Sequence, residues 1–152
     1  MASLLDSKPP QAKAMITTEQ KLHRIDAIGR DCSLRTMDRS FSSTLAVARA
    51  MKELRELLTG EILSAVLPLQ GSPLGFVTDK DKDGGYPEAT VRDVIIEATL
   101  RGYAVVGNEF NIISGRFYAA KAGLTRVVRE LPGLTDLKLT EGKCEMVANG
   151  TG

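Results

Sequence analysis

Histidine, tryptophan and cysteine are almost absent from this chain of 152 residues. His23 is the single histidine, and it lies in a segment with no other catalytic signal, as an exposed helical histidine would. Neither a Gly-x-Ser-x-Gly motif nor a phosphate-binding loop motif occurs. The sequence therefore gives no positive sign of an enzyme, and we expect a non-catalytic protein that requires no cofactor.

The two cysteines, Cys32 and Cys144, are isolated and far apart in the sequence. They form no Cys-x-x-Cys metal motif and no disulfide framework. We expect two reduced thiols in a reducing compartment, and a single disulfide between them stays open as the alternative.

Long apolar runs are also lacking. No run approaches the roughly 20 residues that a membrane span needs, and the N-terminus lacks the apolar stretch of a signal peptide. We therefore expect a cytoplasmic protein without a membrane segment. The net charge is only +1, so any affinity for a polyanion must come from how the charges are distributed.

Hydrophobic residues make up 43% of the chain and aromatic residues only 5%, which predicts one domain with a largely aliphatic core. We expect residues 1–16 to form a mobile leader and residues 17–152 a single α+β domain. Apolar residues recur at helical spacing in several segments. The helices expected from this spacing cover residues 17–30, 43–59, 62–67 and 87–101, and a loop is expected over residues 70–85.

The pattern changes after Gly102. Two segments with alternating residues, 109–113 and 116–120, flank Ser114-Gly115, a pair that favours a tight β-hairpin turn. A short helix is expected over residues 124–130. Further strands are expected over residues 134–139 and 143–147. These strands predict a small antiparallel sheet with a packed helix, and the sheet would be incomplete at Gly152. We expect the chain to be a C-terminal truncation or fragment, or a partner to cover the open edge.

Asp79, Asp81 and Asp83 alternate with two lysines and precede Gly84, which is how a calcium-binding loop begins. Alternate carboxylates can converge on one cation, while glycine permits the turn. The twelfth position of such a loop, which needs a glutamate, is Thr90. The motif predicts either a weakly bound divalent cation, Mg²⁺ or Ca²⁺, or a solvated turn. A metal-dependent enzyme that uses these three residues stays open.

A cluster of cations lies between residues 116 and 129, where there is no acidic residue. On the second hairpin strand, Arg116 and Tyr118 share one face and Phe117 lies on the other. Cations follow the phosphates of single-stranded nucleic acid, and rings stack on unpaired bases. The candidate nucleic-acid-binding residues are Arg116, Tyr118, Lys121, Arg126 and Arg129. The alternative is a solvated basic face with Tyr118 in the core.

Residues 102–123, which read Gly-Tyr-Ala-Val-Val-Gly-Asn-Glu-Phe-Asn-Ile-Ile-Ser-Gly-Arg-Phe-Tyr-Ala-Ala-Lys-Ala-Gly, resemble the RecT and Red-beta-like single-strand DNA annealing proteins of phages. Residues 69–76, Leu-Gln-Gly-Ser-Pro-Leu-Gly-Phe, are similar to the same family. The resemblance covers residues 67–137. Members of this family usually continue beyond the point that corresponds to Gly152.

The resemblance implies an α+β core with a β-hairpin sheet, a groove that binds the phosphate backbone, and homo-oligomeric rings or filaments. It also implies ATP-independent annealing of complementary strands in phage- or prophage-encoded recombination, which needs no nucleophile. A second hypothesis is a non-catalytic interaction module whose open sheet edge pairs with a partner chain.

Overall fold

The computed structural model describes residues 14–134, which fold into five α-helices and three short β-strands. The helices are α1 (Thr18–Asp31), α2 (Phe41–Leu57), α3 (Gly60–Val66), α4 (Glu88–Arg101) and α5 (Lys121–Arg129). The α+β class expected from the sequence is confirmed. No helix in residues 14–134 is long and apolar enough to cross a membrane.

The sheet has the strand order β1-β2-β3, with β1 at Val77–Thr78, β2 at Phe110–Ile113 and β3 at Arg116–Ala119. Strands β2 and β3 form the expected antiparallel hairpin. Strand β1 pairs with β2 in parallel, so the sheet is mixed and the expectation of a purely antiparallel sheet was wrong. Strand β1 lies inside the segment expected to be a loop, where it is only two residues long.

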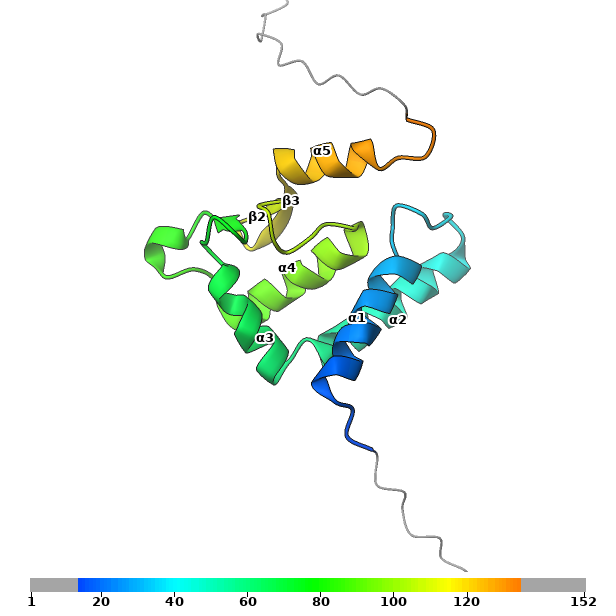
Figure 1. The fold of residues 1–152 in the computed structure, drawn as a ribbon, viewed down its shortest axis with the longest axis horizontal. Coiled ribbons are helices and arrows are strands. Elements are labelled where there is room, and N and C mark those ends of the chain that lie inside the picture. Colours follow the sequence, from blue (N-terminus) through cyan, green and yellow to red (C-terminus); the bar gives the residue numbers. More distant parts are fainter. Residues whose placement is uncertain (1–13, 135–152) are drawn as a thin grey trace, which may run out of the picture.

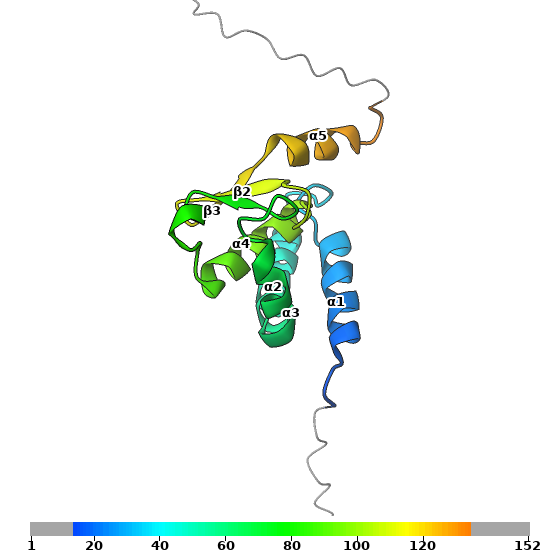
Figure 2. The same cartoon turned by 60° about the vertical axis from the view of Figure 1, so that its left-hand side comes forward.

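Figures 1 and 2 show the order of the layers: α5 and the sheet at one end, α4 next to the sheet, and α1, α2 and α3 at the other end. Helix α4 packs against α1 and α2 on one side and against β3 on the other. It is therefore the element that joins the helical layer to the sheet.

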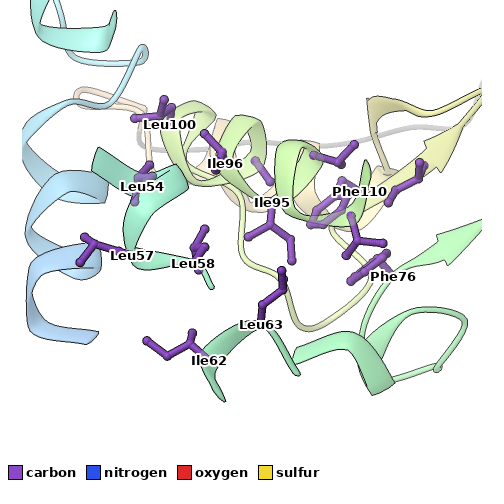
Figure 3. Close-up of a cluster of buried hydrophobic side chains, with 14 of the residues drawn as sticks. Leu54, Leu57, Leu58, Ile62, Leu63, Phe76, Ile95, Ile96, Leu100 and Phe110 are labelled. Carbon is purple, nitrogen blue, oxygen red and sulfur yellow. The ribbon is translucent and has the colours of Figure 1, made fainter. Parts of the chain in front are cut away.

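The core follows both sides of α4 (Figure 3). Leu54 of α2 and Leu63 of α3 are fully buried beside it. On the sheet side, the rings of Phe76 and Phe110 stack with their centroids 5.0 Å apart, and both rings are fully buried. Burial of this apolar area is the main force that holds the short strands on the helices.

The expected helices agree with the observed ones to within a few residues. Helix α1 is capped by Thr17, which forms a reciprocal capping box with Gln20. Helix α2 begins after Ser40, whose hydroxyl accepts a hydrogen bond from the N–H of Ser43. These side chains satisfy backbone donors that the first helical turn leaves without partners.

Helix α4 confirms the expected buried face, and it buries two more side chains, Ile96 and Leu100, because α2 packs on another of its sides. The face expected from the spacing consists of Val91, Val94, Ile95 and Ala98, and all four are buried. Arg101 donates to Glu97 at 2.9 Å, as their spacing predicts, and Gly102 ends the helix in a left-handed conformation.

The hairpin turn at Ser114-Gly115 has positive φ at both residues, 52° and 72°, as a type I′ turn requires. Helix α5 then begins at Lys121 and not at Leu124, so the expected start was three residues late. Gly123 explains the difference, because helix propensity disfavours glycine but packing requires it here. A Cβ at this position would lie 2.2 Å from the carbonyl oxygen of Glu109.

Several expectations lie outside the described residues: the strands at 134–139 and 143–147, Cys144, and residues 1–13 of the leader. Residues 14–16 are exposed and precede α1 without regular structure. Cys32 carries a free thiol at the end of α1.

Substituting Gly123→Ala should lower the free energy of unfolding by about 1–3 kcal/mol, because the new Cβ collides with backbone that cannot move without shifting α5. Urea unfolding followed by circular dichroism measures this change. Ala122→Ser, at an exposed neighbouring position of α5, is the control and should change stability by less than about 0.5 kcal/mol. Equal stability of the two variants would contradict the close packing of α5 on Glu109.

Candidate nucleic-acid interface

The hairpin has one face toward the core and one toward solvent. Its register pairs Ile112 with Phe117 and Asn111 with Tyr118, and paired residues project from the same face. Ile112 is fully buried, and Phe117 packs on the core at 5.5 Å from Phe110. The opposite face is therefore the outer face of the sheet.

Tyr118 projects from this outer face, and its side chain is 48% exposed. The separation of Tyr118 from Phe117 follows the alternation read from the sequence, and the alternative that placed Tyr118 in the core is wrong. Arg116 lies two residues earlier on the same strand and is exposed on the same face. A flat ring and a guanidinium are thus presented side by side.

Two of the predicted cations are available for a ligand. Within residues 14–134, no hydrogen bond or ion pair engages Arg116 or Arg129, and both are exposed. Lys121 is exposed at the start of α5, directly after the strand that carries Arg116 and Tyr118. The structure therefore brings Arg116, Tyr118 and Lys121 onto one strand and its continuation.

Arg126 has a different environment from the one expected. Its guanidinium pairs with both carboxylate oxygens of Glu109, donates to the carbonyl of Gly102 at 2.8 Å, and reaches Glu130 at 2.9 Å. From the sequence, Arg126 was expected to bind nucleic acid together with Arg129. In the structure its guanidinium holds α5 against the hairpin and the end of α4, so Arg126 has partners within the protein that the sequence did not indicate.

Glu109 is the buried partner in this network, with only 9% of its side chain exposed. Burial alone would raise the pKa of Glu109, but hydrogen bonds from Arg126 and from the N–H of Ala104, together with the charge of Arg126, hold it below its ordinary value. The hydrogen bond to Glu109 in turn raises the pKa of Arg126. No sequence pattern predicts this pair, because its members are 17 residues apart and belong to different elements.

The three aspartates of the predicted metal loop do not converge. Asp81 accepts hydrogen bonds from the backbone and the hydroxyl of Thr78, while Asp79 turns to other partners and Asp83 is exposed. In the part of the chain that the structure describes, no group of three or more histidine, cysteine or acidic side chains is arranged to hold a metal ion. Aspartates at alternate positions occur in a solvated turn as well as in a metal-binding loop, and the solvated turn was the alternative interpretation of this motif.

Asp79 instead fastens the hairpin turn. One carboxylate oxygen accepts from the N–H of Ser114 at 3.0 Å, and the other accepts from the hydroxyl of Tyr86 at 2.5 Å. The same hydroxyl accepts from the N–H of Gly115 at 3.0 Å. The hydrogen bond from Tyr86 and then that from Ser114 hold the pKa of Asp79 below its ordinary value. We call Asp79, Tyr86 and the two turn residues the hairpin clasp.

The two edges of the sheet differ in charge. Strand β1 leads directly into residues 79–83, in which three aspartates alternate with two exposed lysines. Strand β3 carries Arg116 and leads into Lys121 at the start of α5. A polyanion on the outer face is therefore expected to follow β3 rather than the mixed charges beside β1.

No protein-family model, no curated protein and no solved structure matches this chain.

Glu109→Gln should lower the free energy of unfolding by about 2–3 kcal/mol at neutral pH, because it leaves Arg126 without its buried counter-charge. The pKa of Glu109 is depressed, so this stabilisation is present above the ordinary carboxyl range and is lost as the pH falls through the folded-state pKa. Urea unfolding at neutral and acid pH measures both effects. Glu130→Gln removes the exposed partner of the same arginine and should change stability by less than about 0.5 kcal/mol. A loss for Glu109→Gln that does not shrink at acid pH argues against the ion pair.

Tyr86→Phe should loosen the hairpin turn, because it removes the hydroxyl that joins Asp79 to Gly115. We expect faster amide exchange at Ser114 and Gly115, and a rise in the pKa of Asp79 toward its ordinary value, both measured by NMR. Tyr103→Phe is the matched control, since its hydroxyl makes no hydrogen bond within residues 14–134. Unchanged exchange at both turn amides in Tyr86→Phe would refute the clasp.

Proposed function

We propose that this protein binds single-stranded DNA on the outer face of its sheet and promotes ATP-independent annealing of complementary strands. The single observation that carries the proposal is the exposed Tyr118 ring beside the guanidinium of Arg116, which has no hydrogen bond or ion pair within residues 14–134. The resemblance of residues 67–137 to phage annealing proteins of the RecT and Red-beta kind supports the same function. By this resemblance the acting form is a cytoplasmic homo-oligomer encoded by a phage or prophage.

The chemistry of the outer face fits an unpaired strand better than a duplex. A ring on a strand can stack on a base only when the base is free of its own stack, and such stacking contributes about 1–3 kcal/mol per base. The guanidinium of Arg116 can bind the phosphate of the same nucleotide or its neighbour. Annealing itself requires binding and release of bases, and no covalent bond in the DNA is made or broken.

Fluorescence anisotropy of one labelled oligonucleotide, single-stranded and then as duplex, at two salt concentrations tests the proposal. We expect tighter binding of the single strand and a steep loss of affinity with salt. Absence of single-strand binding at low salt would contradict the proposal.

Arg129→Ala should weaken single-strand binding about fivefold at 0.1 M salt and reduce the slope of log K against log salt by about 0.7. Arg116→Ala should behave alike. Arg49→Ala, an exposed arginine on α2, removes the same charge away from the sheet and should change neither quantity (Figure 1). Arg126 is unsuitable for this test, because its loss also detaches α5. An unchanged slope in Arg116→Ala and Arg129→Ala would refute their assignment.

A second candidate function is an interaction module whose sheet accepts a strand from a partner chain. In the described residues β3 pairs only with β2, so its other edge has no strand partner. A hollow of about 300 Å³ adjoins this strand. It is lined by Leu34, Arg35, Arg101, Tyr103, Phe117, Ala119 and Val127. This function predicts self-association that is insensitive to salt and no change in the anisotropy of a labelled oligonucleotide.

A further inference from the structure

Three side chains, one from each strand, form a row across the outer face of the sheet. The register pairs Asn111 of β2 with Val77 of β1 and with Tyr118 of β3. The residues before and after Asn111, Phe110 and Ile112, are fully buried, so the row points away from the core. Val77 and Tyr118 are 43% and 48% exposed, and Asn111 between them is half-buried.

The middle member of this row is an unusual choice for a central strand. Asparagine is depleted in strands, where a β-branched residue such as threonine packs better. The carboxamide oxygen of Asn111 is covered by neighbouring atoms, yet it accepts no hydrogen bond within residues 14–134. Covered polar atoms without partners are few in native proteins. Within residues 14–134 the side chains of Arg92 and Asn108 also carry a covered polar atom without a partner, but of the three residues only Asn111 lies in the exposed row of the sheet.

We infer that Asn111 and Tyr118 form a subsite for an unpaired adenine base of single-stranded DNA. The Tyr118 ring stacks on the base, and the carboxamide of Asn111 hydrogen-bonds the edge that carries N6 and N7. The inference rests on the proposed function, because it names the base that the same face selects.

The choice of adenine follows from the donor and acceptor pattern of the bases. A carboxamide offers one donor and one acceptor side by side, and adenine offers the complementary pair at N7 and N6. On the corresponding edge guanine presents two acceptors, while cytosine presents a single donor and thymine a single acceptor. Contact at this edge also leaves the Watson–Crick edge free to meet a complementary strand, which annealing requires.

The amide can reach this arrangement by rotation about its terminal torsion, which is broad for asparagine. A partial rotation would turn both polar atoms of the carboxamide toward the base, so that the oxygen accepts from N6 and the amino group donates to N7. Arg116 lies on the same face two residues from Tyr118, or about 7 Å along the strand, close enough to bind the phosphate of the stacked nucleotide. Base and backbone are thus bound by neighbouring groups.

Three labelled oligonucleotides of equal length test the subsite by fluorescence anisotropy at low salt. One is all thymine, the second carries adenine at every third position, and the third carries 7-deazaadenine there, which stacks and pairs like adenine but lacks the N7 acceptor. The wild type should bind the adenine strand about fivefold or more tightly than the other two. Equal affinity for adenine and 7-deazaadenine overturns the subsite while leaving single-strand binding intact.

Asn111→Thr should remove the preference for adenine and leave binding of the thymine strand within about twofold of wild type, with an unchanged or higher Tm. Ile113→Thr, on the same face of β2, is the matched control and should keep the preference. A lowered Tm together with loss of all binding in Asn111→Thr would show a structural role and overturn the inference. Failure of the wild type to bind any of the three strands would instead refute the proposed function.

Discussion

The buried carboxylate of Glu109 is the constraint that positions the hairpin, α5 and the end of α4 relative to one another. It lies directly before β2, accepts a hydrogen bond from the N–H of Ala104 at 2.6 Å and pairs with Arg126 of α5. Arg126 in turn donates to the carbonyl of Gly102 at the end of α4. Three elements therefore meet at one ion pair, and the position of α5 over the hairpin follows from it. Besides this pair, α5 is held by the close approach at Gly123 and by Arg35, which donates to the carbonyl of Val127 at 3.0 Å.

Much of the fold could be read from the sequence, because most of it depends on local patterns. The buried face of α4, the caps near Thr17 and Ser40, and the turn at Ser114-Gly115 all follow from spacing or from the chemistry of single residues. Strand β1 could not be predicted, because two residues carry no periodic signal. Its place is set by backbone hydrogen bonds to a strand more than 30 residues later. The start of α5 was missed for a similar reason, since Gly123 is selected by a tertiary contact that outweighs its helix propensity.

In the candidate site too, the features that follow from local spacing were predictable and the tertiary partners were not. Alternation along a strand has a period of two, so the sequence was sufficient to place Arg116 and Tyr118 together and Phe117 apart. The spacing of Arg126 and Arg129 shows that they share a side of a helix, but it does not show that Arg126 forms an ion pair with Glu109. Likewise, the alternating aspartates indicate converging oxygens only if no nearer donor competes. Thr78 is such a donor only three residues from Asp81, while Tyr86 and Ser114 reach Asp79 through the fold, which the sequence alone does not show.

Both ends of the hairpin are thus fixed by carboxylates. Asp79 and Tyr86 hold the turn, and Glu109 holds the opposite end through Arg126. Each of these acids accepts hydrogen bonds from donors of the protein. The outer face between them presents an amide on β2 and a ring and a guanidinium on β3, in a hairpin held at both ends. A rigid strand of this kind loses little conformational entropy when it orders a flexible polyanion, because the ordering falls on the ligand alone. Under the proposed function, the internal ion pair and the clasp would therefore serve binding indirectly, by fixing the spacing of groups that they never touch.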